Sequence, residues 1–130
     1  MNIPSNLKYA TTDEWLKIEG KIATIGVSDF AQSQLSDIVY FEFKVDPGEA
    51  VSKNEVCATM ESVKAAADVN FPVSGTVLEI NDALTDDFEK INTDPYGDAW
   101  IAKIELSDPS ELNTLLDAAA YTKYCEERSH

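Results

Sequence analysis

The sequence holds a single histidine, and this residue, His130, is the last of the chain. Nucleophile relays, general bases and zinc sites that depend on histidine therefore cannot be assembled inside the fold. The two cysteines, Cys57 and Cys125, lack a C-x-x-C spacing, so we expect buried, reduced thiols and no disulfide. We predict that the chain is not an enzyme by itself, and that an attached cofactor supplies the reactive group for any covalent chemistry.

Long apolar runs and basic residues are also scarce. No run approaches the ~20 apolar residues that span a bilayer, and no secretion signal or arginine-rich presequence leads the chain. Twenty-four acidic residues against ten basic ones give a formal charge of -14, which repels nucleic acid and anionic lipid. We expect a monomer with no nucleic-acid or membrane partner, in the bacterial cytoplasm, or in the mitochondrial matrix if a presequence has been removed. The acidic surface is either simply solvated or steers the chain towards basic patches on other proteins.

The apolar pattern predicts a mainly β fold in one domain, 1–130. The chain is 44% hydrophobic, which is enough to build a core at this length. Short runs of period-2 or β-branched character, separated by turn signals such as Glu19-Gly20 and Pro47-Gly48, are typical of antiparallel strands. The predicted strands fall within 7–19, 21–27, 37–44, 49–61, 69–71, 77–80 and 99–106.

Two helices are predicted beside these strands. Ser28 can cap a short helix in the N-terminal half that ends at Leu35. A C-terminal helical segment over about 108–127 begins with Asp108, Pro109 and Glu111, a capping-box arrangement. We expect this helix to place Leu112, Leu115 and Leu116 on one inward face. The acidic stretch 81–94 is interpreted as a loop with one or two helical turns, and its spacing does not fit a calcium loop, so no metal site is predicted.

A lysine lies between two of the predicted strands, in a hairpin of about 56–71. At such a tip Lys64 would project into solvent, where another enzyme can reach its ammonium. Ala65 and the alanines after it place little bulk beside the tip, and Gly75 permits a tight turn or a close backbone approach. By spacing alone, an ordinary surface lysine and a modified lysine both remain open.

The unit around Lys64 resembles the lipoyl and biotinyl carrier-domain family, in which the modified lysine occupies a hairpin tip. Biotin carriers usually have methionine on both sides of the lysine, and lipoyl domains of 2-oxoacid dehydrogenases usually have aspartate before it. Val63 and Ala65 fit neither habit but match the H proteins of the glycine cleavage system. Segments along nearly the whole chain resemble that family: Leu7-Lys8-Tyr9, Glu14-Trp15, Ile25-Gly26-Val27, Phe30-Ala31-Gln32, Asp37-Ile38-Val39, 61–66, 72–75, Ile91-Asn92, 94–97 and Trp100.

The resemblance implies a flattened β-barrel or sandwich hybrid that carries lipoic acid as lipoyllysine at Lys64. A lipoyl ligase or transferase would attach the group, with Glu61, Ser62, Val63 and Ala65 recognised around the lysine. The carrier would take an aminomethyl group from a pyridoxal-phosphate glycine decarboxylase and pass it to a tetrahydrofolate-dependent aminomethyltransferase. Dihydrolipoyl dehydrogenase would then reoxidise the dihydrolipoyl thiols.

The resemblance also implies a cleft beside the hairpin that shelters the loaded arm. Glu14 and Asp68 match its acidic positions and could pair with an ammonium, while Thr12 offers a hydroxyl. Two residues depart from the family: Asp13 stands where histidine is common, and Ser36 where glycine is common. The first removes a titratable ring and adds a negative charge near the expected cofactor surface.

Three other functions remain open from the sequence. The protein could serve chiefly as a lipoyl donor to other lipoylated complexes, as a biotin carrier domain, or as an unmodified β-rich interaction module. Val63 and Ala65 argue against biotin. The mass of any group found on Lys64 separates the last two from the lipoyl functions.

Overall fold

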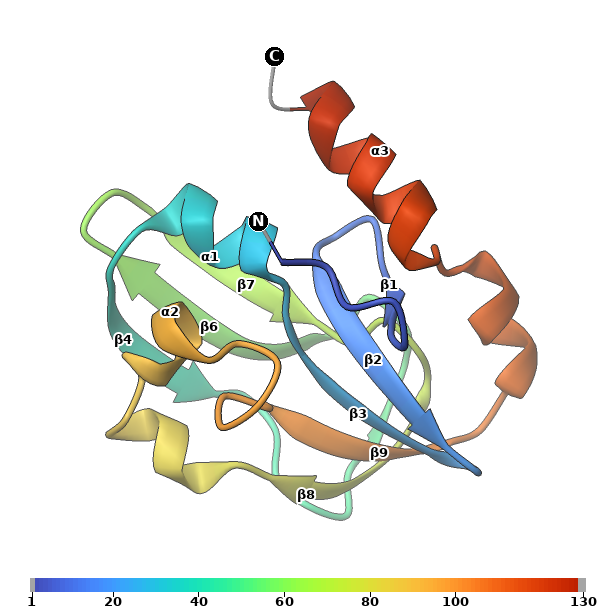
Figure 1. Cartoon of the computed structure of the whole chain (residues 1–130). Helices are drawn as coiled ribbons and strands as arrows, with labels where there is room; N and C mark the ends of the chain where they lie inside the picture. The colour runs from blue at the N-terminus through green and yellow to red at the C-terminus, as the bar shows by residue number, and fades with distance from the viewer. Residues whose placement is uncertain (1, 129–130) are drawn as a thin grey trace.

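The computed structural model describes residues 2–128 and forms two antiparallel sheets that pack as a sandwich (Figure 1). The larger sheet has the order β1-β2-β3-β9-β8-β5, and the smaller one has the order β4-β6-β7. The strands of the larger sheet are β1 (Lys8–Tyr9), β2 (Glu14–Glu19), β3 (Ile22–Val27), β5 (Ala50–Val51), β8 (Gly75–Ile80) and β9 (Ala102–Leu106). Those of the smaller sheet are β4 (Ile38–Phe43), β6 (Val56–Ser62) and β7 (Ala66–Asn70). The mainly β sandwich predicted from the sequence is confirmed.

Two hairpins expected from turn signals are present. Gly20 has a φ of +64° and closes the β2–β3 hairpin, in which Glu14 pairs with Val27 at the open end. Glycine adopts this left-handed conformation without the steric cost that a Cβ brings. The β6–β7 hairpin spans residues 56–70, close to the 56–71 predicted, and Glu61 pairs with Ala66 beside its tip.

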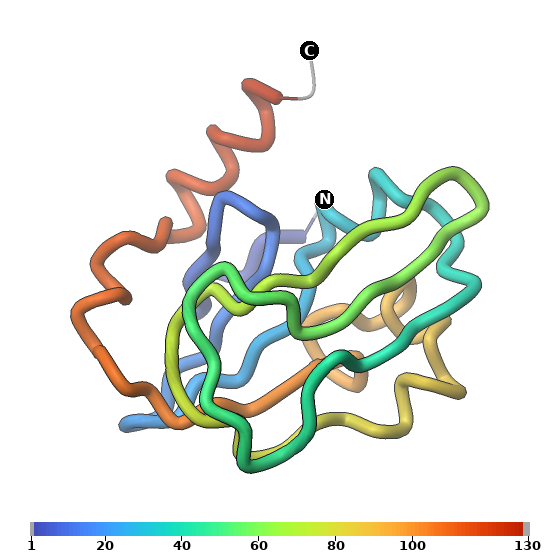
Figure 2. Tube along the Cα trace, turned by 180° about the vertical axis from the view of Figure 1, so that it is seen from behind, coloured from blue at the N-terminus to red at the C-terminus, as the bar shows by residue number. Residues whose placement is uncertain are grey.

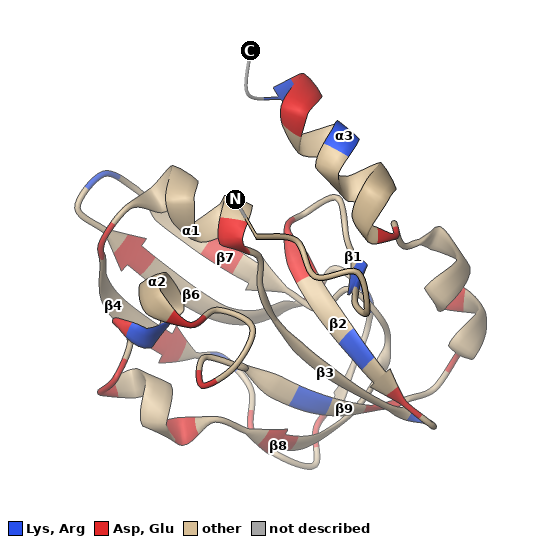
Figure 3. Cartoon of the chain, viewed as in Figure 1, with Lys and Arg blue, Asp and Glu red and all other residues tan. Residues whose placement is uncertain are grey.

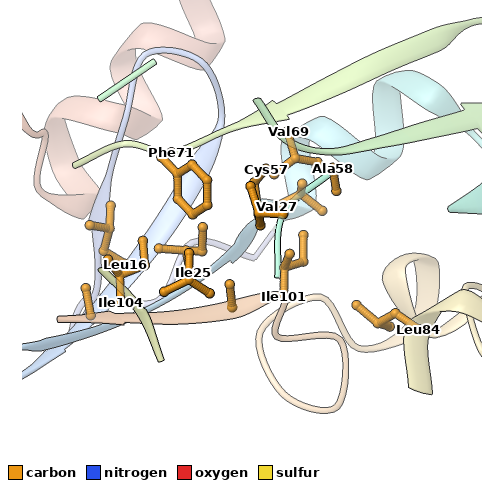
Figure 4. Close-up of a cluster of buried hydrophobic side chains, with 14 of the residues drawn as sticks. Leu16, Ile25, Val27, Cys57, Ala58, Val69, Phe71, Leu84, Ile101 and Ile104 are labelled. Atoms are coloured by element: carbon orange, nitrogen blue, oxygen red, sulfur yellow. The ribbon is translucent and has the colours of Figure 1, made fainter. Parts of the chain in front are cut away.

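The core lies between the two sheets, where alternate side chains of each strand meet (Figure 4). Leu16, Ile25 and Ile104 come from the larger sheet and are fully buried. At Gly75 a Cβ would lie 2.1 Å from the Glu105 carbonyl oxygen, so β8 can approach β9 this closely only with glycine. The close approach expected at Gly75 is therefore confirmed.

The helices before β9 follow the prediction. Ser28 caps α1 (Asp29–Leu35), and its Oγ accepts a hydrogen bond of 3.1 Å from the Ala31 amide. The stretch predicted to hold helical turns contains η1 (Asp82–Thr85), a 3₁₀ helix, and α2 (Lys90–Thr93). No helix within residues 2–128 is long and apolar enough to cross a membrane.

The C-terminal segment is not the single helix predicted over 108–127. It is a 3₁₀ helix, η2 (Pro109–Thr114), and an α-helix, α3 (Ala118–Arg128), separated by an extended stretch. The break arises because Leu116 bonds to Tyr9 like a strand residue, with N···O distances of 2.7 and 2.8 Å. Leu112 and Leu115 pack against the main core and Leu116 against a second apolar cluster. The inward face of α3 is formed instead by Tyr121 and Cys125.

Both cysteines are buried free thiols, as predicted. Burial raises the pKa of the Cys57 thiol to about 12, so this thiol stays protonated and unreactive at neutral pH. The prediction about His130 concerns a residue outside the described range.

Candidate functional site

Lys64 lies at the exposed tip of the β6–β7 hairpin. The Ser62 hydroxyl organises the turn, because its Oγ accepts hydrogen bonds from the amides of Lys64 (3.1 Å) and Ala65 (3.0 Å). The Ser62 amide in turn donates to the Ala65 carbonyl at 2.8 Å. The backbone groups of the turn are therefore hydrogen-bonded within the turn itself. The side chains of Val63 and Lys64 are left in solvent, with Val63 68% exposed.

Near its tip, the hairpin is held by β4 and the residue before it. Ile38 pairs with Ser62, and the Val63 amide donates to the Asp37 carbonyl at 3.3 Å. Beyond this point the hairpin tip extends past β4, with α1 beside it in both views (Figures 1 and 2). Lys64 is thus presented on a short, anchored projection that another protein can approach.

A cleft of about 200 Å³ lies beside this hairpin. The residues from Thr12 to Glu14, α1 and the paired strands β6 and β7 enclose it. Its walls combine apolar side chains with three carboxyl groups and two other polar side chains. The lining residues are Thr12, Asp13, Glu14, Val27, Ala31, Gln34, Leu35, Met60, Ala67 and Asp68.

Glu14 is the buried acid of the cleft, with only 1% of the residue exposed. Its carboxyl group accepts hydrogen bonds from the Thr12 hydroxyl and, at 3.4 Å, from the Asn70 amide. Burial raises the pKa of Glu14 to about 8, the two hydrogen bonds oppose this shift, and the charge of Asp13 adds to it. At neutral pH the carboxyl group is therefore mostly protonated, and a cation entering the cleft would favour its ionised form.

Thr12, Glu14 and Asp68, the three residues that the resemblance assigned to a cofactor cleft, all line this one cleft. Asp68 and Thr12 are exposed at its edge, and Asp68 pairs with Thr59 on β6. Lys64 does not line the cleft. It lies four residues before Asp68, in the turn that precedes β7.

Sequence reasoning missed the apolar walls of the cleft. Ala31 and Leu35 are four residues apart on α1 and so share one helix face. Met60 and Ala67 are paired across β6 and β7. The helical spacing was a usable signal for α1, but nothing in the local pattern distinguishes a cleft wall from a core contact.

The fold and the site define a class of protein: a β-sandwich that presents one lysine on a hairpin beside a sheltered cleft is suited to carry a covalently attached group. The family model described as "Glycine cleavage H-protein" matches residues 7–128. The chain belongs to this family and is a lipoyl carrier protein of the glycine cleavage system.

Relatives support the assignment over almost the whole chain. The chain is 46% identical to the glycine cleavage system H protein of Symbiobacterium thermophilum, covering 97% of the chain and 98% of the relative. It is 48% identical to the mitochondrial H protein of Pisum sativum, covering 97% of the chain and 76% of the relative. The crystal structure of an H protein from Mycobacterium marinum matches with a TM-score of 0.83 at 30% identity, covering 98% of the chain and 100% of that structure. Membership of this family decides against the biotin-carrier alternative.

Proposed function

We propose that Lys64 is the lipoyl attachment site and that the adjoining cleft receives the modified side chain, the arm. The observation that carries this proposal is the exposed lysine on an anchored hairpin next to a cleft with a buried carboxyl group. In a family that carries a lipoyl group, these features give Lys64 the access that a modifying enzyme needs.

The cleft residues fit the group chemically. Val27, Leu35 and Met60 offer apolar contact for a hydrocarbon chain and a disulfide ring, which are themselves apolar. When bound, a lipoyl group supplies a dithiol–disulfide couple that can also hold a one-carbon unit. The chain contributes the shelter for it.

The polar residues of the cleft have distinct roles in this proposal. Glu14, on the buried side, offers a carboxylate to an ammonium held in the cleft, and the Thr12 hydroxyl fixes its orientation. Asp68, at the exposed edge, adds a second negative charge. An ion pair formed at Glu14 is partly desolvated, so it is stronger than one at the surface. The apolar walls limit the water that could attack the bound group.

Intact mass and peptide mapping test the attachment site. Protein made in a lipoate-competent host should carry one lipoyl increment on the peptide that contains Lys64. Lys64→Arg should lose this increment, whereas Lys123→Arg, on α3, should keep it. An increment that persists in Lys64→Arg, or that maps to another lysine, would overturn the proposal.

The partners follow from the same proposal. A lipoyl ligase or transferase would recognise Glu61, Ser62, Val63 and Ala65 around the lysine. The glycine decarboxylase, the aminomethyltransferase and dihydrolipoyl dehydrogenase would each receive the arm in turn. A tethered group reaches each enzyme at high effective concentration, provided that the arm spans the distance.

The compartment stays a prediction. Bacterial and plant mitochondrial relatives match at 46% and 48% identity. Of the two compartments considered, we propose the bacterial cytoplasm.

A further inference from the structure

The last turn of α3 is tied to the loop that forms one wall of the cleft. Arg128 makes a bidentate ion pair with Asp13, with N···O distances of 2.5 and 3.2 Å. Its guanidinium also lies over two aromatic rings, 4.5 Å from the centroid of Phe30 and 4.2 Å from that of Tyr124. A planar guanidinium can satisfy a carboxylate and stack on rings at the same time, which an ammonium cannot do equally well.

A second set of contacts joins the same loop to the opposite wall. The Tyr121 hydroxyl donates to Asp13 at 2.8 Å and lies 2.6 Å from Ser28 Oγ. Because the Tyr121 proton is directed at Asp13, the Ser28 hydroxyl donates to Tyr121. Ser28 is the N-cap of α1, whose side chains Ala31, Gln34 and Leu35 line the cleft. The Ser28 amide also donates to the Asp13 carbonyl at 2.9 Å.

Asp13 thus links the loop to α1 in two ways, directly through the Ser28 amide and indirectly through Tyr121 of α3. We call the set Asp13, Ser28, Tyr121 and Arg128 the latch. Asp13 has a φ of +78°, a conformation that aspartate tolerates better than most residues but that still needs support. Glu14 follows directly, so the backbone that Asp13 adopts sets where the buried carboxyl group enters the cleft.

We propose that the latch is a positioning device that fixes the spacing between the two walls of the cleft and keeps water away from Glu14, with Arg128 as its key residue. This inference deepens the proposed role of the cleft. It can nevertheless be tested on unmodified protein, and so separately from attachment at Lys64.

The test is the titration of Glu14 in the unmodified full-length chain, followed by NMR of its carboxyl carbon. The charged or ionisable groups around Glu14 are Asp13 on its own loop, Asp68 on β7 and Cys57 on β6. If the latch excludes water, Arg128→Gln lowers the pKa of Glu14 by about one unit, because the carboxylate becomes hydrated. If Arg128 acts only through its charge, its loss leaves the negative charge of Asp13 uncompensated. The pKa of Glu14 then stays constant or rises. The latter result would overturn the proposal.

Three further variants complete the test. Tyr121→Phe keeps the ring but loses the hydroxyl, so it should also lower the Glu14 pKa, and Arg128→Lys should restore only part of the wild-type value. Lys123→Gln removes one cation from an exposed position on the same helix and should leave the Glu14 pKa unchanged. A shift in Lys123→Gln equal to that in Arg128→Gln would contradict a specific latch.

Amide exchange gives an independent readout. The Asn70 amide donates to Glu14, so opening of the cleft in Arg128→Gln should speed its exchange by about tenfold. A general loss of stability would speed exchange throughout the core instead. If amide exchange becomes faster throughout the core and the pKa of Glu14 does not change, Arg128 contributes only to overall stability and the proposal is overturned.

Discussion

Ser36 adopts a backbone conformation that few residues other than glycine occupy. Its φ is 67° and its ψ is −152°. The conformation is held from both sides, since the Ser36 amide donates to Gln32 at 2.9 Å and its carbonyl accepts from Asn92 at 2.8 Å. The strain lies at the position where the resemblance led us to expect glycine, so the serine found there carries a local conformational cost.

Replacing this serine should therefore stabilise the protein. Ser36→Gly relieves the strain, and we expect the free energy of unfolding to rise by about 1 kcal/mol, measured by urea denaturation. Ser33→Gly is the matched control, because Ser33 lies within α1, where glycine should lower stability by about 0.5–1 kcal/mol. If both variants lose stability, the conformation at Ser36 is not a strained one.

Glu14 should make stability depend on pH. Its pKa is about 8 in the folded protein and 4.5 as a free group, so the folded state binds the proton more tightly. The stabilisation from this proton is present below about pH 4.5 and is lost as the pH rises towards about 8. In urea denaturation, the free energy of unfolding of the wild type should fall by more than about 1 kcal/mol between these two pH values. Glu14→Gln should lack the part of this fall that is due to Glu14. Matching profiles for the two proteins would mean that Glu14 is already ionised in the fold.

At the scale of elements, Gly75 controls how closely β8 and β9 approach. A Cβ there would lie 2.1 Å from the Glu105 carbonyl oxygen and 2.6 Å from Ile104. Gly75→Ala should lower the free energy of unfolding by at least about 2 kcal/mol, because backbone and a buried side chain must both shift. Gly20→Ala meets nothing within 4 Å and should cost only the strain of its positive φ, about 1 kcal/mol. Thermal and urea unfolding distinguish the two, and equal losses would argue against the close approach.

The sequence predicted most elements because each carries its own local signal. The Ser28 cap and the Glu19-Gly20 turn depend only on neighbouring residues. The C-terminal helix was predicted, but its interruption was not, because the capping box at Asp108 gives no information about Leu116, which pairs with distant Tyr9. Likewise the polar residues of the cleft were grouped through family resemblance, whereas the contact between Arg128 and Asp13 joins residues 115 apart and has no local signature.

Over the whole molecule, acidic residues are spread across both sheets and the connecting loops (Figure 3). A charge of -14 creates a field that extends about a Debye length, ~10 Å at 0.1 M salt. If the field guides the carrier to basic patches on the enzymes of the system, association rates should fall about tenfold or more from low to high salt. Stopped-flow mixing with each enzyme measures this. Rates that do not change with salt would mean that the acids serve only to keep the surface solvated.

The contact between Asp13 and α3 also affects the stage of folding at which the cleft closes. Tyr121 and Asp13 are 108 residues apart, and closing so long a loop is entropically costly and tends to come late in folding. During synthesis the β6–β7 hairpin leaves the ribosome well before α3 does. If Lys64 is the attachment site, as proposed, a modifying enzyme can then meet this lysine before α3 has closed the cleft. The order of attachment and closure would depend on the relative speed of translation and modification.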